Sequence, residues 1–502
     1  MDASPLHEQA LEALRHGDLE LARARFQDAV RSCSDDARLL RELAGSLWGL
    51  YDFESALEAY RRAAEAEPRN IEAHLLAAQK LFSVGRFPQC AEWLEQALAA
   101  SAGRGPALVM LGEVYDRHNR LDDAERCAHE ALAAAPQEVK AVRLAAHLER
   151  RRGQFDRARR RLEEQLGRFP GPEDWRLQYE LAAVLDRLGE YDGAMSALIA
   201  AKAQLEPQSR VHFAVARNIR QRQQEVAARL TRSDFTAWRA LKLQPTREIA
   251  YLCGHPRSGT TLLEQILGAH PDVATTDETG ILSREYIEPI LRQPASADAG
   301  VEELRSFTPQ QINEGRAAYL QFTEAHLGNR LGARLLVEKD PSLTPDLPLP
   351  LRLFPEARIL FPLRDPRDVC VSYFFTLLPL NAVSVAAADL RSTCEHCAHS
   401  LRSWQHWREF LPYPWLETRY EDLVVQPESE VRRMLDFLGV TWSEQVLSFH
   451  ERVAAKGIRT PTYADVAQPL YQRAVGRWKN YEKHLAPHIA VLRPWLHVFG
   501  YE

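Results

Sequence analysis

The segment from Gly254 to Leu263 reads Gly-His-Pro-Arg-Ser-Gly-Thr-Thr-Leu-Leu, and its residue types could bind a phosphate or sulfate group. Two glycines separated by four residues lie between a short apolar run and a helical pattern. The backbone N–H groups of such a loop, together with the helix N-terminus, form an anion site. An ordinary phosphate-binding loop ends in Gly-Lys-Ser/Thr, but here Thr260 replaces the lysine and the cation is Arg257. That lysine normally reaches the β- and γ-phosphates of a nucleoside triphosphate, so its loss argues against ATP hydrolysis or kinase chemistry.

A second segment with anion-binding character runs from Leu363 to Ser372. Arg364 ends an apolar run, Asp365 suits the N-cap of the next helix, and Pro366 suits its first turn. Arg364 could donate a bidentate pair of hydrogen bonds to a phosphate, and Ser372 a hydroxyl. Taken alone, this segment could equally be a surface network of Arg and Asp. Both segments occur in order and each follows a predicted strand, which favours anion binding.

The two segments require a scaffold that gathers the ends of several strands at one edge. Short apolar runs without helical period recur in the C-terminal half, and each is followed by a loop and a helical stretch. Strands that alternate with helices indicate an α/β fold with a P-loop-like parallel sheet, whose ligands bind at the carboxyl ends of the strands. The predicted strands are residues 249–253, 335–337, 358–363 and 415–419.

The N-terminal half has an internal period of 34 residues, which predicts two helices per repeat. The period is marked by Gly17, Tyr51, Gly85, Asn119 and Gly153, and Gly189 follows 36 residues after the last of these. Five positions beyond each marker lies a small residue that would let two helices approach closely, namely Ala22, Ala56, Cys90, Ala124, Ala158 and Ala194. The pattern resembles tetratricopeptide repeats, about six of them. The alternative is an unrelated helical bundle rich in Ala and Leu.

The repeats predict an all-α superhelix with a concave face over residues 1–206. A protein or peptide could bind in that groove, or the array could serve as a scaffold or dimerisation arm; the sequence leaves both open. Residues 207–245 are predicted to form a charged helical connector rich in Arg and Gln. The α/β domain then covers residues 246–502, which makes the protein multidomain.

The overall composition limits the possible classes of protein. Of 502 residues, 45% are hydrophobic and 26% charged, which excludes a wholly disordered or collagen-like chain. A net charge of -6 argues against binding to nucleic acid by phosphate neutralisation. Seven cysteines favour reduced thiols in the cytoplasm, and neither a signal peptide nor a membrane span is expected.

The hexamer Pro256 to Thr261 resembles the 5′-phosphosulfate loop of sulfotransferases, which use 3′-phosphoadenosine 5′-phosphosulfate (PAPS). The segment around Arg364 and Ser372 resembles the 3′-phosphate site of the same family. The resemblance implies the sulfotransferase fold, PAPS as the sulfuryl donor and no metal. It also implies that PAPS is bound by Arg257, Ser258, Gly259, Thr260, Thr261, Arg364 and Ser372.

Two further segments resemble the tyrosylprotein sulfotransferases. Ala-His-Pro-Asp-Val at residues 269–273 leads into Asp-Glu-Thr-Gly at 277–280, which implies that Glu278 is the catalytic base. Capping of a helix N-terminus is the structural alternative for Glu278. Glu-Lys-Asp-Pro at 338–341 resembles a segment whose lysine contacts the sulfuryl group. Lys339 and Arg257 would then neutralise the charge that develops in the reaction.

The same resemblance implies weaker contacts near the C-terminus and an acceptor contact. Tyr420 resembles the tyrosine that packs near the adenine. Thr-Pro-Thr at 460–462 and Gly-Arg-Trp at 476–478 resemble the segment that closes over the nucleotide, where Thr462, or Thr460 in its place, and Arg477 would contact PAPS. Arg284 matches an arginine that holds acidic peptide substrates. Gly280 replaces a second such arginine, which leaves the acceptor hydroxyl compound open.

Two other functions remain as alternatives to sulfuryl transfer. One is a non-catalytic repeat scaffold joined to a degenerate nucleotide-binding domain, and the other is a P-loop phosphotransferase that needs ATP and Mg²⁺. The combination of tetratricopeptide repeats with a sulfotransferase domain resembles fused proteins of bacterial type. Cys394, Cys397 and His399 have a spacing seen in zinc sites, but no second Cys pair follows, so we interpret them as structural.

Overall fold

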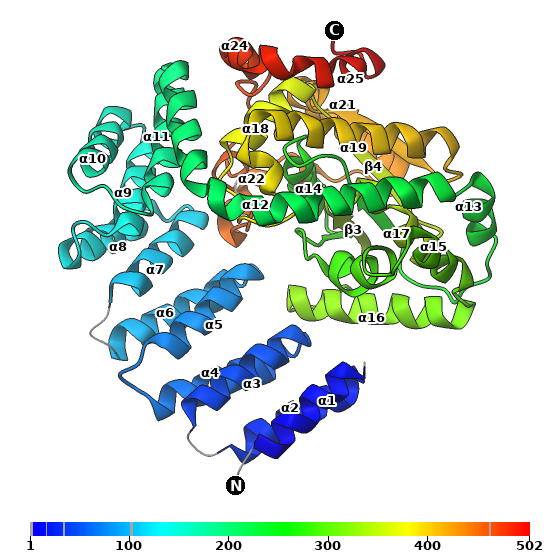
Figure 1. The fold of residues 1–502 in the computed structure, drawn as a ribbon, viewed down its shortest axis with the longest axis horizontal. Coiled ribbons are helices and arrows are strands. Elements are labelled where there is room, and N and C mark those ends of the chain that lie inside the picture. Colours follow the sequence, from blue (N-terminus) through cyan, green and yellow to red (C-terminus); the bar gives the residue numbers. More distant parts are fainter. Residues whose placement is uncertain (1–3, 17, 34–35, 101–103, 461–462) are drawn as a thin grey trace. The chain divides into compact units, whose positions relative to one another are not determined.

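The computed structural model describes residues 4–16, 18–33, 36–100, 104–460 and 463–502. The chain forms two compact units. The first comprises Met1–Arg152 with Glu324–Asn329, and the second comprises Gly153–Thr323 with Arg330–Glu502. Within Met1–Arg152 the described residues are helices and turns, whereas the second unit contains a β-sheet (Figure 1).

The described residues of Met1–Arg152 form four antiparallel helix pairs and one further helix, as the 34-residue period predicts. Each described marker ends the first helix of a pair in the left-handed backbone region, with φ of 60° at Tyr51, 76° at Gly85 and 57° at Asn119. The marker at position 17 lies outside the described residues. The helices are α1 (Ser4–Arg15), α2 (Leu19–Ser32), α3 (Ala37–Gly49), α4 (Phe53–Ala66), α5 (Glu72–Ser83), α6 (Phe87–Ala100), α7 (Gly105–Arg117), α8 (Leu121–Ala134) and α9 (Val139–Arg151).

The small residues predicted at the helix crossings are fully buried. All six, from Ala22 to Ala194, have no exposed surface. Because a larger side chain would hold the two helices apart, these positions explain why the period can be recognised in the sequence.

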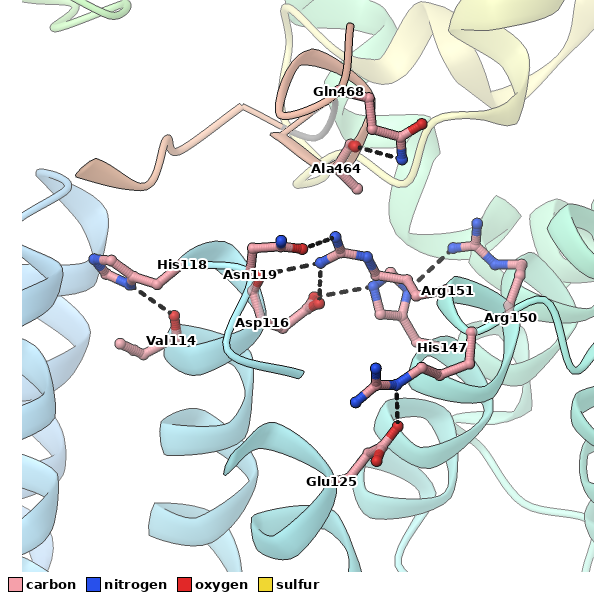
Figure 2. A network of polar contacts seen from close by, with 11 residues as sticks. Val114, Asp116, His118, Asn119, Glu125, His147, Arg150, Arg151, Ala464 and Gln468 are labelled. Carbon is pink, nitrogen blue, oxygen red and sulfur yellow. Dashed lines mark hydrogen bonds and ion pairs between the residues drawn. The ribbon is translucent and has the colours of Figure 1, made fainter. Parts of the chain in front are cut away.

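A polar network joins consecutive repeats through one carboxylate (Figure 2). Asp116 of α7 is 2% exposed and accepts hydrogen bonds from Arg151 and, at 3.0 Å, from His147 Nε2. Arg151 also donates to the Asp116 backbone oxygen at 3.0 Å and to Asn119 Oδ1 at 2.8 Å. The left-handed turn at Asn119 is therefore fixed from the following repeat by a buried, charge-assisted network.

The helical pattern of the repeats continues into the second unit, whose first four helices precede the first strand in the sequence. The helix α12 runs unbroken for 39 residues with Pro207 inside it, and appears as the long green ribbon in Figure 1. The predicted boundary at residue 206 falls within this helix, and the division into residues 1–206, 207–245 and 246–502 stays a prediction. The helices are α10 (Phe155–Arg168), α11 (Asp174–Leu188), α12 (Tyr191–Arg229) and α13 (Arg232–Arg239).

The sheet has five parallel strands in the order β2-β3-β1-β4-β5. Every residue of β1 and of β3 is buried, as expected for central parallel strands covered on both faces. The order places the carboxyl end of β1 between those of β3 and β4, so the two predicted anion-binding segments and the Lys339 segment meet at one edge. The strands are β1 (Ile249–Leu252), β2 (Val273–Thr275), β3 (Leu335–Lys339), β4 (Arg358–Leu363) and β5 (Trp415–Arg419).

Helices occupy most of the chain between and after the strands. Among the described residues, no helix is both long enough and apolar enough to cross a membrane. The helices are α14 (Thr260–Gly268), η1 (Ser283–Arg292), α15 (Ala297–Ser306), α16 (Pro309–Leu327), η2 (Thr344–Asp346), α17 (Pro348–Leu353), α18 (Pro366–Phe375), η3 (Val385–Ala388), α19 (Leu390–Phe410), α20 (Tyr420–Val425), α21 (Pro427–Leu438), η4 (Glu444–Val446), α22 (Phe449–Lys456), α23 (Tyr463–Val466), η5 (Arg477–Tyr481), α24 (Glu482–Leu485), η6 (Ala486–Val491) and α25 (Arg493–Val498).

Candidate functional site

The loop between β1 and α14 is held in one conformation by side chains from neighbouring segments. Gly254 has a φ of 132°. Its backbone N–H donates to Thr344 Oγ1 at 3.0 Å, and its carbonyl accepts from Thr344 Oγ1 at 2.8 Å and from Ser400 Oγ at 3.0 Å. Ser258 Oγ donates to the His255 carbonyl at 2.8 Å. The loop therefore presents its N–H groups from a rigid frame, as an anion site requires.

Gly259, the N-cap of α14, needs both its conformation and its lack of a side chain. Its φ is 102°, in the region that favours glycine. A Cβ built at this position would lie 2.9 Å from Cδ2 of the Tyr420 ring. The ring of Tyr420 therefore packs directly against the loop, while its contact with an adenine stays a prediction.

We expect Gly259→Ala to lower the thermal unfolding midpoint and to weaken nucleotide binding. The left-handed conformation costs an L-residue about 1–2 kcal/mol, and displacement of the Tyr420 ring adds roughly 1–3 kcal/mol. The matched control is Gly332→Ala, since Gly332 has a φ of 63° but nothing within 4 Å of a built Cβ. Thermal melts should show the larger drop for Gly259→Ala; equal drops would contradict the close approach of Tyr420.

Two arginines, the half-buried Arg257 and the buried Arg364, meet at the predicted anion site. Arg257 Nε donates to Ser372 Oγ at 3.0 Å, and Arg364 Nη1 donates to the Arg257 carbonyl at 3.2 Å. The guanidinium of Arg364 lies 4.7 Å from the centroid of the Tyr420 ring. Burial, together with the nearby charge of Arg364, lowers the pKa of Arg257 to about 10. Two like charges held this close in a poorly solvated place favour an anion between them.

Arg364 retains an unused donor in this cluster. Its Nη2 donates to the Ala474 carbonyl at 2.5 Å, while Nε is buried and has no hydrogen-bond partner among the described residues. An unsatisfied buried donor on a cation is costly unless a ligand completes it. The helix that follows begins as predicted, because Asp365 is the N-cap of α18 and accepts from the Arg367 N–H at 2.9 Å.

The second group of predicted residues is an ion-paired cluster at the end of β3. Lys339 Nζ lies 2.5 Å from Glu278 Oε1, 3.4 Å from Glu264 Oε2 and 3.8 Å from Asp277 Oδ1. Burial alone would lower the pKa of Lys339, but the charges of Glu278, Glu264 and Asp277 raise it above its usual value. The Lys339 side chain has no exposed surface, whereas that of Glu278 is 41% exposed. Glu278 is thus the member of the pair that is accessible from solvent.

The backbone at Glu278 is fixed in an unusual conformation. Asp277 and Glu278 have φ of 52° and 57°, and the Glu278 N–H donates to the Lys339 carbonyl at 3.1 Å. Arg459 Nη2 donates to the Glu278 carbonyl at 2.8 Å, and the same guanidinium contacts Asp277. Consecutive non-glycine residues in the left-handed region typically occur at functional sites. Glu278 does not occupy a helix N-cap position, because the π-helix η1 that follows begins at Ser283 and its N-cap residue is Leu282.

Two residues of this cluster were not identified from the sequence. Glu264 lies on α14, fully buried and close to Lys339. The available signal was an acidic residue directly after the apolar pair Leu262 and Leu263. Arg459 directly precedes the Thr-Pro-Thr segment, but nothing in its neighbours indicates that it reaches Asp277.

The remaining predicted site residues lie in different parts of the structure and differ in exposure. Thr260 and Thr261 form the first turn of α14. Thr460 is 6% exposed, and Thr462 lies outside the described residues. The side chain of Arg284 is 57% exposed and pairs with Glu285 at 3.0 Å. Arg477 pairs with Asp186 of α11 at 2.9 Å.

The histidines and cysteines near the loop are packed in the interior. Burial, with a contribution from His396, holds the pKa of His255 well below its usual range. The centroid of the His255 ring lies 5.5 Å from that of the Tyr373 ring. His399 Nε2 lies 2.9 Å from Gln223 Oε1. Within the ranges that the structure describes, no group of three or more His, Cys, Asp or Glu side chains could hold a metal ion.

Comparison with known families and proteins agrees with this architecture. Residues 250–444 match the model of the sulfotransferase family, and residues 42–105 and 143–209 match a tetratricopeptide repeat model. Protein-tyrosine sulfotransferase 2 of Gallus gallus is 29% identical over 286 residues, covering 52% of this chain and 72% of that protein. An uncharacterized protein of Aquifex aeolicus (strain VF5) is 28% identical over 329 residues, covering 63% of this chain but only 41% of the relative.

Two solved structures show partial likeness. The sulfotransferase domain from the curacin biosynthetic pathway aligns with a TM-score of 0.30 and 17% identity, over 48% of this chain and 99% of that one. A tetratricopeptide repeat protein from Parabacteroides merdae ATCC 43184 aligns with a TM-score of 0.34 and 21% identity, over 43% of this chain and 85% of that one. By the family models, the chain is similar to tetratricopeptide repeat proteins over residues 42–105 and 143–209 and to the sulfotransferase family over residues 250–444.

Proposed function

We propose that the protein transfers the sulfuryl group of PAPS to an acceptor hydroxyl. The observation that carries the proposal is the pair of arginines at the carboxyl edge of the sheet, the half-buried Arg257 and the buried Arg364. One of them has an unused buried donor, and the cluster of Glu278 and Lys339 lies at the neighbouring strand end. The named relatives that are protein-tyrosine sulfotransferases support the same reaction class.

The residues present fit a polyanionic nucleotide. The loop from Arg257 to Thr261 would hold the 5′-phosphosulfate, and Arg364 with Ser372 would hold the 3′-phosphate. A bound anion would satisfy Arg364 Nε and relieve the repulsion between the two guanidinium groups. Tyr420 would pack against the adenine. PAPS, when bound, supplies the activated sulfuryl group.

The chemistry of the chain itself rests on three side chains. Glu278 would accept the proton of the acceptor hydroxyl, because its side chain is accessible and its backbone is fixed on both sides. Lys339, bonded to Glu278 at 2.5 Å, holds that carboxylate in place. Lys339 and Arg257 together supply positive charge at the strand ends, where negative charge would grow on the departing group.

The proposal also covers the acceptor molecule and the cellular compartment of the reaction. We propose an acceptor hydroxyl on a protein or peptide, including tyrosyl, with the repeats recruiting the acceptor or a partner, because such arrays commonly present a concave binding surface. The exposed Arg284 could then contact the acceptor. We propose the cytoplasm as the place of the reaction, since all seven cysteines are buried and so few in a chain of 502 residues favour reduced thiols.

The proposal is tested by calorimetric titration with 3′-phosphoadenosine 5′-phosphate (PAP) and, separately, with ATP and Mg²⁺. We expect binding of PAP in clear preference to ATP, because the loop lacks the lysine that contacts the γ-phosphate. Transfer of radiolabelled sulfate from PAPS to a protein lysate should follow. Preference for ATP would favour the phosphotransferase, and binding of neither nucleotide would favour the non-catalytic scaffold.

A further inference from the structure

A carboxylate from the repeat-like helix α11 contacts the C-terminal segment that is expected to lie over the nucleotide. Asp186 Oδ1 is 2.9 Å from Arg477 Nη2 and 3.3 Å from Arg477 Nε, and it accepts a hydrogen bond from the Tyr481 hydroxyl at 2.5 Å. The side chains of Asp186 and Arg477 are only 17% and 23% exposed. All three residues belong to the second compact unit. One carboxylate therefore holds two consecutive turns of this segment.

The same C-terminal segment is also held by α18, the helix that carries Ser372 of the predicted anion site. Asp368 of α18 accepts hydrogen bonds from the backbone N–H groups of Gly476 and Trp478, both at 2.7 Å. The Arg477 guanidinium between them lies 4.5 Å from the centroid of the Phe375 ring. Phe375 is one helical turn after Ser372, the residue that accepts from Arg257. Arg477 is thus held at the end of the helix that carries part of the anion site.

The geometry leaves Arg477 able to bind an anion. A guanidinium is a planar fork with donors on more than one edge, and Asp186 uses the edge formed by Nε and Nη2. The charge of Arg477 also acts on Arg257, whose pKa it helps to lower, so the two guanidinium groups share one local field. The charge of Arg477, added to those of Arg257 and Arg364, is unfavourable in the empty site because like charges repel. It becomes favourable when a polyanion is bound.

We propose that Asp186 is a positioning residue of the nucleotide site: it holds Arg477 beside the anion-binding cluster, so that a helix of the repeat-like region completes the site. This inference rests on the proposed binding of PAPS. Asp186 does not touch the nucleotide; it acts through Arg477 and Tyr481. The repeat-like region would thereby contribute to donor binding, a role separate from the recruitment of an acceptor.

The test is Asp186→Asn in the full-length chain, with binding of PAP measured by calorimetry. We expect the Kd for PAP to rise roughly tenfold, the size of one charge-assisted hydrogen bond. The KM for PAPS should rise in parallel, while kcat at saturating PAPS and the KM for the acceptor stay within about twofold, since only donor binding uses Arg477. Asp186→Glu should restore most of the affinity.

The chain offers a matched control on the next helix. Asp192 of α12 pairs with Lys483 at 2.5 Å and with His484 at 3.1 Å, in the same C-terminal region, but Asp192 and Lys483 are both 65% exposed. Asp192→Asn should leave the Kd for PAP unchanged, because an exposed ion pair contributes little. If Asp192→Asn weakens binding as much as Asp186→Asn does, general loosening of the segment explains both, and the proposal is wrong.

A double-mutant cycle keeps the proposal testable if Asp186→Asn lowers the thermal midpoint. If Asp186 acts through Arg477, Asp186→Asn should weaken PAP binding no further in an Arg477→Gln background. Additive losses would overturn the proposal. Unchanged or tighter PAP binding by Asp186→Asn alone would also overturn it, and tighter binding would mean that Asp186 keeps Arg477 away from the nucleotide. Failure of the wild-type protein to bind PAP would instead reject the proposed function.

Discussion

Glu278→Gln is expected to lower kcat for sulfuryl transfer by a factor of about 10²–10⁴, the usual contribution of a well-positioned base. The amide keeps the size and the hydrogen-bonding shape of the side chain but cannot accept the proton of the acceptor hydroxyl. The Kd for PAP should stay close to the wild-type value, because the nucleotide cluster around Arg257 and Arg364 does not include Glu278. Single-turnover transfer of radiolabelled sulfate and calorimetry with PAP measure the two quantities.

The matched control for Glu278 is Glu288→Gln. Glu288 lies on η1, 48% exposed, and its contact with Arg292 is 3.7 Å long. Removing that charge should change kcat by less than about twofold, as is usual for an exposed pair. Full activity in Glu278→Gln or Glu278→Ala would show that the base is another residue. A thermal melt of each variant separates loss of chemistry from loss of the ion pair with Lys339.

Arg364→Met is expected to weaken PAP binding about 100-fold, since removal of one partner of a buried charge pair typically costs about 2–5 kcal/mol. Arg364 supports the loop through the Arg257 carbonyl, contacts the Tyr420 ring and carries the unused Nε donor. Methionine fills much of the same volume without charge or donors. Both the anion contact and the position of the loop should therefore suffer, and calorimetry with PAP measures the loss.

The opposite end of the same strand provides the control for Arg364. Arg358 begins β4 and pairs with Glu248 at 3.0 Å, away from the carboxyl edge. Arg358→Met removes a similar side chain from the same element and should leave the Kd for PAP within about twofold, as expected for a pair on the solvent side. Unchanged PAP binding in Arg364→Met would contradict the proposed 3′-phosphate site.

Much of the sheet could be predicted because its strands are short apolar runs with clear ends. The predicted strand at 415–419 agrees with β5, and that at 249–253 exceeds β1 by one residue. β2 was missed, because three residues carry too little pattern to be separated from a loop. β3 extends to Lys339, beyond the predicted end at 337, since the charged Glu338 and Lys339 hide the strand although both are buried.

The site was predictable where function depends on local spacing and unpredictable where it depends on distant partners. The loop at 254–263 and the cap at Asp365 could be identified from adjacent residues. Asp186 is nearly 300 positions from Arg477, and Glu264 is paired with a lysine on another element, so neither contact has a local signature. The 34-residue period likewise predicted the helices α10 to α12 but not their inclusion in the compact unit that contains the sheet.

The inclusion of α11 and α12 in the unit that contains the sheet has a consequence for how such a gene can change. Duplication or deletion of whole repeats is tolerated where each repeat contacts only its neighbours. In the first unit, the repeats that carry Phe53 and Arg86 also contact His326 and Ala325, and are therefore less free to change than the others. The last pair is different, because Asp186 and Asp192 bond to residues of the C-terminal segment. Natural variation in repeat number should therefore be confined to the amino-terminal side of Gly153, with the final pair inherited together with the sulfotransferase region.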